Sequence, residues 1–370
     1  MGSARELLEI LDGELDSPIF DKFHIGAAFT RLARHKGTFD ATLQGSQAVN
    51  QLIAKAAEFL AEDKLPTRES ANVLWAIASM GEIGVSLHAL LPDLIDKALI
   101  NVKDLEPQHV SNIIWAAATL QLPDAELKRL LPSLCSRVPE LAAEFIPQAI
   151  ANMIWASATL KGRAPALLEV LPCLMEEVPR VAKDLKTQEV SNILWAGAAL
   201  REEHATLWLS VIPHLRQAAV AKLHKATPQE VANSVWALAW LDPSPQEASD
   251  ALKRLSVVAT SLEDKMTAQQ LANTCLGFAL RSVSCPAFLD SVARSVIAHV
   301  HSWPSSARSK DLPEMLWAFA KLGVVNKQLM LVASSALEGI LSDVTAWCLC
   351  VVVSDCLNPL MFGNMPFRTV

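Results

Sequence analysis

The sequence predicts an all-α protein, an α-solenoid built from about seven stacked helical repeats of 40 residues each. Three observations support this fold class. A tryptophan-centred motif recurs at a fixed spacing, capping residues or a first-turn proline mark the start of several of the motif helices, and 51% hydrophobic with 19% charged residues is enough to bury a core along the whole chain.

The repeat is clearest in ten-residue segments that align on their tryptophans. Trp75, Trp115, Trp155 and Trp195 are each 40 residues apart, and Trp236 follows after 41. The aligned segments are ANVLWAIASM (71–80), SNIIWAAATL (111–120), ANMIWASATL (151–160), SNILWAGAAL (191–200) and ANSVWALAWL (232–241), with weaker copies ANTCLGFAL (272–280) and PEMLWAFAKL (313–322). A degenerate copy is expected in HIGAAFTRLARHKG (24–37).

Each motif segment is predicted to be a helix. Thr227 with Glu230 and Thr267 with Gln270 have the spacing of capping boxes, and apolar residues then recur every three or four positions. A second helical stretch precedes each motif and carries a proline, which we expect to kink it or divide it into two short helices, in LLPDL (90–94), LLPSL (130–134), VLPCL (170–174) and VIPHL (211–215). Two or three helices in 40 residues is the size of an armadillo or HEAT repeat.

The pattern divides the chain into three parts: an N-terminal segment with the degenerate repeat (1–40), the repeat solenoid (41–325) and a C-terminal helical cap (326–370). The end of a solenoid must cover an apolar face that inner repeats bury against a neighbour. The residues expected to form this cover are Leu329, Leu331, Val332, Leu337, Ile340, Leu341 and Trp347.

Composition and motifs argue against several other classes of protein. The acidic N-terminus does not resemble a secretory signal or an Arg-rich presequence, and the apolar run 344–353 is too short to span a bilayer, so no membrane association is expected. Seven scattered cysteines suggest reduced, mostly buried thiols. Neither phosphate-loop nor nucleophile motifs are found, and the histidines lack metal-ligand spacing. We therefore expect no enzyme activity, catalytic residue, metal, cofactor or small-molecule substrate.

The pattern Asn-x-x-Trp-Ala-x-Ala-x-Leu, with Gln seven residues before the Trp, resembles the repeats of organellar RNA proteins of the octotricopeptide and FAST-kinase types. It is also similar to the repeat domain of a subunit of the RNA-editing substrate-binding complex of kinetoplastid mitochondria. The resemblance covers about residues 20 to 325, and no RAP-type nuclease-like domain follows the repeats. It implies binding of single-stranded RNA in a mitochondrion or plastid, in RNA processing, editing or stability. Because no presequence is visible, a cytoplasmic location is the alternative.

Gln and Asn side chains of successive repeats lie on one stripe of the motif helix, because they precede the Trp by seven and three residues. The candidate RNA- or partner-binding residues on this stripe are Gln108, Asn112, Gln148, Asn152, Gln188, Asn192, Gln229 and Asn233. These amides could face a groove and bond a ligand, or they could bond the backbone of a neighbouring repeat. We expect Trp115, Trp155 and Trp195 to be mostly buried between repeats.

A residue that is identical in every repeat cannot distinguish one base from another, so discrimination would need positions that vary. The position six residues before the Trp varies and is acidic in four of the seven repeats, which is unfavourable beside phosphates. Its occupants are Glu69, His109, Ala149, Glu189, Glu230, Gln270 and Asp311.

A lysine recurs eleven or twelve residues before the Trp position, in the segment that enters the motif helix. These further binding candidates are Lys64, Lys103, Lys183, Lys225 and Lys265. Such a row could follow a phosphate backbone, or it could be a solvated edge, since an aspartate adjoins four of the five.

Two functions remain open. The first is a non-enzymatic RNA-binding adaptor, and the alternative is an armadillo-like scaffold that binds a peptide or protein partner. The formal net charge of −7 favours the scaffold, because nucleic-acid-binding domains usually carry a basic surface.

Overall fold

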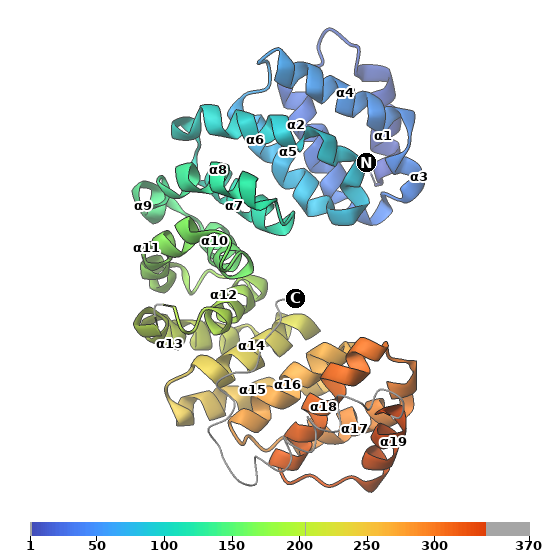
Figure 1. Cartoon of the computed structure of the whole chain (residues 1–370), viewed down its shortest axis with the longest axis vertical. Helices are drawn as coiled ribbons and strands as arrows, with labels where there is room; N and C mark the ends of the chain where they lie inside the picture. Colours follow the sequence, from blue (N-terminus) through green and yellow to red (C-terminus); the bar gives the residue numbers. More distant parts are fainter. Residues whose placement is uncertain (1, 204, 338–370) are drawn as a thin grey trace. The chain divides into compact units, whose positions relative to one another are not determined.

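The computed structural model describes residues 2–203 and 205–337, and every regular element in this part of the chain is helical. The chain divides into two compact units, Met1–Val181 and Ala182–Val370, coloured blue to green and green to red in Figure 1. The partition into 1–40, 41–325 and 326–370 rests on the repeat pattern and stays a prediction.

The first unit contains two layers of helices. Its helices are α1 (Ala4–Glu14), α2 (Lys22–Arg34), α3 (Ala41–Gln44), α4 (Gln47–Ala61), α5 (Thr67–Met80), α6 (Leu91–Ile100), α7 (Pro107–Thr119), α8 (Asp124–Cys135), α9 (Val138–Leu141), α10 (Pro147–Thr159) and α11 (Pro165–Val181). The motif helices form one layer, in which α2 packs on α5, α5 on α7 and α7 on α10. In the other layer α1 packs on α4, α4 on α6, α6 on α8 and α8 on α11.

The second unit repeats this order. Its helices are α12 (Thr187–Ala199), α13 (Ala205–Ala221), α14 (Pro228–Leu241), α15 (Pro245–Leu262), α16 (Ala268–Leu280), α17 (Pro286–His299), α18 (Ser305–Lys321) and α19 (Lys327–Leu337). Motif helices α12, α14, α16 and α18 stack in sequence, while α13, α15, α17 and α19 stack as the second layer. Each helix therefore contacts its neighbours in the sequence order, which is the packing of an α-solenoid.

Short 3₁₀ turns join the second helix of a repeat to the next motif helix. They are η3 (Val102–Asp104), η4 (Ala142–Glu144), η5 (Leu223–Lys225), η6 (Glu263–Lys265) and η7 (Val300–Ser302). Two other 3₁₀ segments, η1 (Lys36–Thr38) and η2 (Gly81–Leu90), lie elsewhere in the first unit. The predicted capping boxes are present, because Thr227 and Thr267 each exchange hydrogen bonds with the residue three positions on. These caps fix where the motif helices begin.

The prolines in the second helices act differently from one repeat to the next. Pro92 lies in the first turn of α6, where its missing N–H costs nothing. Pro132 lies near the end of α8, and the short helix α9 follows. α11 and α13, in contrast, run on through Pro172 and Pro213, so of the two expected alternatives, a kink or a division, the division does not occur there.

Small residues let the motif helices approach closely. Ala116 and Ala118 of α7 are fully buried, and so are their counterparts in α10, Ala156 and Ala158. At Gly277 of α16 an added Cβ would lie 2.9 Å from the backbone oxygen of Val235 in α14. The backbones of these two helices are therefore nearly in contact.

One helical run, Thr67–Ile100, has the length and hydropathy of a membrane span, with a mean hydropathy of 1.4 in its most apolar window. Half of that window is buried inside the protein. α5, the first part of this run, packs between α2 and α7 and ends at Gly81, whose φ of +59° leaves the helical region. These are the properties of a core helix.

The last described helix, α19, packs on α17 and α18 and buries Leu329 and Leu337. Leu331, expected to face the solenoid, is 72% exposed instead. Val332 is half-buried, and the remaining proposed cover residues Ile340, Leu341 and Trp347 lie outside the described residues, as do the apolar run 344–353, Cys348, Cys350 and Cys356.

Candidate functional site

The amide stripe of the first unit lines a depression of about 220 Å³ on the motif-helix layer. It is bounded by side chains from α2, α5, α7 and α10, which stack in this order. The lining residues are Thr30, Arg34, Asn72, Trp75, Gln108, Ser111, Asn112, Ile146, Gln148, Ala149 and Asn152. The structure thus brings four of the predicted binding residues together: Gln108, Asn112, Gln148 and Asn152.

The amides in this depression have unused hydrogen-bonding capacity. Within the described part of the chain, the side chains of Asn72, Asn112 and Asn152 make no hydrogen bond to the protein, although all three are half-buried. Gln108 and Gln148 are exposed and equally without side-chain partners among the described residues. The interpretation that these Asn residues bond a neighbouring backbone is therefore wrong for the first unit, and each amide can both donate to and accept from a ligand.

The tryptophans of the earlier repeats are mostly covered but keep part of their surface accessible. Trp115, Trp155 and Trp195 are half-buried, and Trp75 presents part of its ring to the depression. Full burial is reached in the later repeats, where Trp236 and Trp317 are 7% and 5% exposed. In the first unit an indole surface is therefore available beside the amides.

The second unit carries the same stripe. On α12 and α14, Gln188 and Gln229 are exposed while Asn192 and Asn233 are half-buried, as in the first unit. The pattern changes in α18, the last motif helix. Glu314 stands three residues before the Trp, where the earlier repeats have Asn, and Lys310 stands seven residues before it, where most of them have Gln. Desolvation raises the pKa of the Glu314 carboxyl to about 7, with Lys310 acting in the opposite direction.

All five predicted lysines, Lys64, Lys103, Lys183, Lys225 and Lys265, are exposed. Lys64 pairs with Glu62 at 2.5 Å, and this hydrogen bond raises the pKa of its ammonium group. The other four form no ion pair within the described part of the chain, so their charges are available to a ligand.

The turns that carry these lysines are held by cations from the following repeat, which the sequence reasoning missed. Arg137 donates to the backbone oxygens of Val102 at 2.8 Å and Lys103 at 2.6 Å. Lys222 donates in the same way to Lys183 at 2.8 Å. A basic residue recurring 14 to 18 positions before the Trp is the signal that could have shown it.

A second set of arginines holds the opposite ends of the motif helices. Arg163 bonds the backbone oxygen of Leu122 at 2.7 Å and the carboxylate of Asp124 at 2.8 Å, and Arg281 bonds the backbone oxygens of Ala239 and Asp242 at 2.7 and 2.6 Å. Successive repeats are thus cross-linked at both ends by side chains that bind backbone carbonyl groups of the preceding repeat.

The variable position six residues before the Trp is buried in five of the seven repeats and half-buried in the other two. Glu189 and Asp311 are buried there, and His109 is 3% exposed, which lowers the pKa of its imidazole by desolvation. In three helices the residue caps the helix, for example Glu189 accepting from the backbone N of Lys186 at 2.8 Å. At Glu189, Glu230 and Gln270 this position therefore serves helix capping.

Among the described residues no cluster of three or more His, Cys, Asp or Glu side chains could hold a metal ion. The described cysteines Cys135, Cys173, Cys275 and Cys285 are all free thiols. Burial raises the pKa of Cys135 and Cys285 to about 12, which makes them poor nucleophiles.

Comparison with known proteins adds no family to this description. No model of a protein family matches the chain, and no curated protein matches its sequence.

Proposed function

We propose that the protein is a non-enzymatic adaptor that binds single-stranded RNA along its motif-helix layer, in organellar RNA processing, editing or stability. The observation that carries this proposal is the depression in the first unit, where amides without protein partners adjoin the exposed part of Trp75. Amides can bond base edges and phosphate oxygens, and an indole face can stack a base.

The charge of this depression also favours RNA over the armadillo-like peptide scaffold. Its lining includes the exposed Arg34 but no carboxylate, although the chain as a whole carries a formal net charge of −7. A polyanion is attracted by such a local arrangement even when the rest of the surface is acidic.

The repeat spacing agrees with a nucleotide chain. Packed helices are about 8–10 Å apart, and known helical-repeat proteins place one base on each repeat. Since Asn and Trp recur, they would supply affinity in every repeat but no sequence discrimination.

The test is fluorescence anisotropy with a labelled 12-nucleotide oligouridylate at several salt concentrations. Affinity should fall linearly with salt on a log-log plot, with a slope of about 0.7 per phosphate contact. The double variant Asn112→Ala/Asn152→Ala should weaken binding, whereas Asn50→Ala, an exposed asparagine on α4, should not. Changing Lys103, Lys183, Lys225 and Lys265 to Gln should lower the slope by up to about three.

A peptide scaffold gives the opposite pattern. RNA affinity would then be negligible at physiological salt, the lysine changes would have little effect, and the double Asn variant would weaken a protein partner. Weak RNA binding without salt dependence would also refute the RNA proposal. The organellar location comes from the family resemblance, and import of the full chain into isolated mitochondria tests it against a cytoplasmic one.

A further inference from the structure

The first motif helix, α2, carries a different stripe from the others. Its N-terminal cap, Asp21 with His24 at the third helical position, sets the register. In α14 the Trp stands six residues after the equivalent capping residue, Glu230. The same count on α2 places Thr30 at the Trp position, and the stripe Gln-Asn-Trp becomes Phe23, Ala27 and Thr30.

These replacements leave a recess between α2 and α5. Small Ala27 and Thr30 stand where the other helices carry Asn and Trp, and the recess has a volume of about 290 Å³. Phe23 lies at one side with 60% of its surface exposed. Thr30, Arg34 and Asn72 line both the recess and the amide-lined depression, so the two are continuous.

Glu69 of α5 lines this recess, and its carboxylate lacks the hydrogen bond that a glutamate at the same position makes in other motif helices. Glu189 and Glu230 occupy the same third helical position and accept a hydrogen bond from the backbone N–H of the residue that caps the helix. In α5 the capping residue is Pro66, which has no N–H to donate. Glu69 is 8% exposed and makes no hydrogen bond or ion pair with any other described residue.

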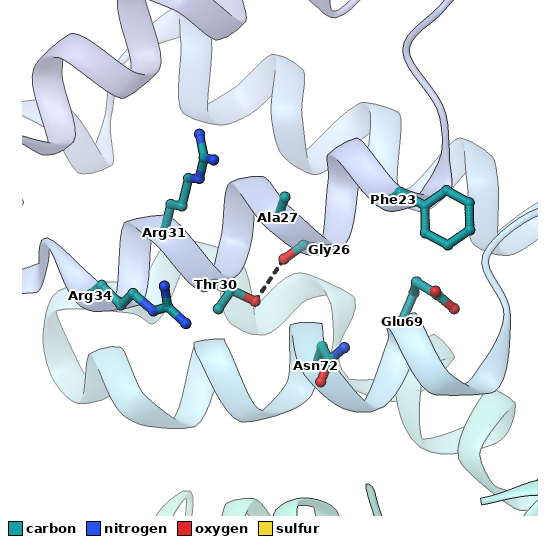
Figure 2. Close-up of a pocket in the computed structure, with 8 residues that line it drawn as sticks. All are labelled: Phe23, Gly26, Ala27, Thr30, Arg31, Arg34, Glu69 and Asn72. Atoms are coloured by element: carbon teal, nitrogen blue, oxygen red, sulfur yellow. Dashed lines mark hydrogen bonds between the residues drawn. The ribbon is translucent and has the colours of Figure 1, made fainter. Parts of the chain in front are cut away.

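The side chains therefore converge from two helices with complementary chemistry. Figure 2 shows Glu69 and Asn72 rising from α5 beneath Phe23, Ala27 and Thr30 of α2, with Arg31 and Arg34 along the same helix. Thr30 already donates its hydroxyl to the backbone oxygen of Gly26 at 2.7 Å. The carboxylate of Glu69 is left as the strongest acceptor in the recess, beside an aromatic ring.

We propose that this recess recognises a guanine base at one end of the RNA bound in the depression, an inference that rests on the proposed function. Guanine alone among the four bases has two adjacent donors, N1–H and N2–H, on its Watson–Crick edge, and one carboxylate can accept from both. The ring of Phe23 stacks the base, and the exposed Arg34, which lines both the recess and the depression, binds a neighbouring phosphate. This end of the groove thus supplies the base discrimination that the repeated Asn and Trp residues cannot.

The test compares a 12-nucleotide oligouridylate with versions that carry a single guanosine, inosine or adenosine. Wild-type protein should prefer the guanosine oligomer over oligouridylate by roughly 5- to 150-fold, as expected for one bidentate base contact. Inosine, which lacks the N2 amino group, should lose part of this preference, and adenosine should lose all of it.

Glu69→Gln should abolish the preference for guanosine while leaving oligouridylate binding intact, and Glu9→Gln, an exposed glutamate on α1, should preserve it. Phe23→Ala should weaken guanosine binding at least about threefold; because Phe23 is exposed, this variant does not depend on core packing. Unfolding temperatures equal to wild type verify that each variant is folded.

Equal affinity for all four oligomers would overturn the guanine site, and so would a Glu69→Gln variant that binds every oligomer more tightly, since the carboxylate would then only repel phosphate. If oligouridylate binds and the double Asn variant weakens it, either result leaves the proposed function standing. Absence of binding to every oligomer would refute both.

Discussion

Glu314 is an acidic residue at the position that earlier repeats fill with Asn, and its burial makes the stability of the second unit pH-dependent. Desolvation raises the pKa of its carboxyl from 4.5 to about 7, against the opposing effect of Lys310 and with a smaller contribution from the charge of Asp311. The folded protein therefore binds more protons than the unfolded chain between about pH 4.5 and 7. Stability contributed by this group is present at low pH and is lost as pH rises through 7.

The magnitude follows from the two pKa values. The difference between 4.5 and about 7 corresponds to a cost of at most about 3 kcal/mol above pH 7, where the folded state must carry the buried charge. Glu314→Gln removes the charge and keeps the shape of the side chain. The variant should therefore match wild type near pH 4.5 and be more stable by up to about 3 kcal/mol at pH 8.

The assay is urea unfolding followed by circular dichroism at pH values from 4.5 to 8.5. Glu202→Gln, an exposed glutamate in the same unit, is the matched control and should follow wild type throughout. Glu314→Asn, which restores the residue of the earlier repeats, should remove the pH dependence as the Gln variant does. A difference between Glu314→Gln and wild type that is the same at pH 5 and pH 8 would refute the reasoning.

Three further predictions concern packing and thiol reactivity. Trp208 is 2% exposed, and Trp208→Ala should lower the free energy of unfolding in urea by about 3–5 kcal/mol. Trp155→Ala, at a half-buried position, should lower it clearly less, and equal losses would mean that exposure does not set the effect. Gly197→Ala should destabilise by about 1–3 kcal/mol, because the new Cβ would lie 2.8 Å from a ring carbon of Trp208; a double-mutant cycle with Trp208→Leu should show coupling, and additive effects would exclude this clash. Burial raises the pKa of Cys275 well above its usual value, so Cys275 should react with a thiol reagent only on unfolding, while half-buried Cys173 reacts in the native state; mass spectrometry of labelled peptides shows the order, and early labelling of Cys275 would contradict it.

The helical fold could be predicted from the sequence because its signals are local. A 40-residue period, a capping pair such as Thr227 and Glu230, and small residues beside each Trp specify where a helix begins and which face is buried. The shared stripe of Asn112 and Asn152 also follows from helix geometry alone.

The partners of these side chains could not be predicted, because they come from other helices. Only the packing of α2, α5, α7 and α10 shows that the Asn side chains meet in one depression without protein partners. The same holds for Arg137, whose carbonyl partners belong to a turn of the preceding repeat.

The recess beside α2 shows both contributions at once. The sequence by itself determined that Pro66 has no N–H for Glu69, since a capping box needs a donor at the capping position. Only the tertiary structure decided where the released carboxylate lies, because the space it faces exists where the small side chains of Ala27 and Thr30 are packed against α5.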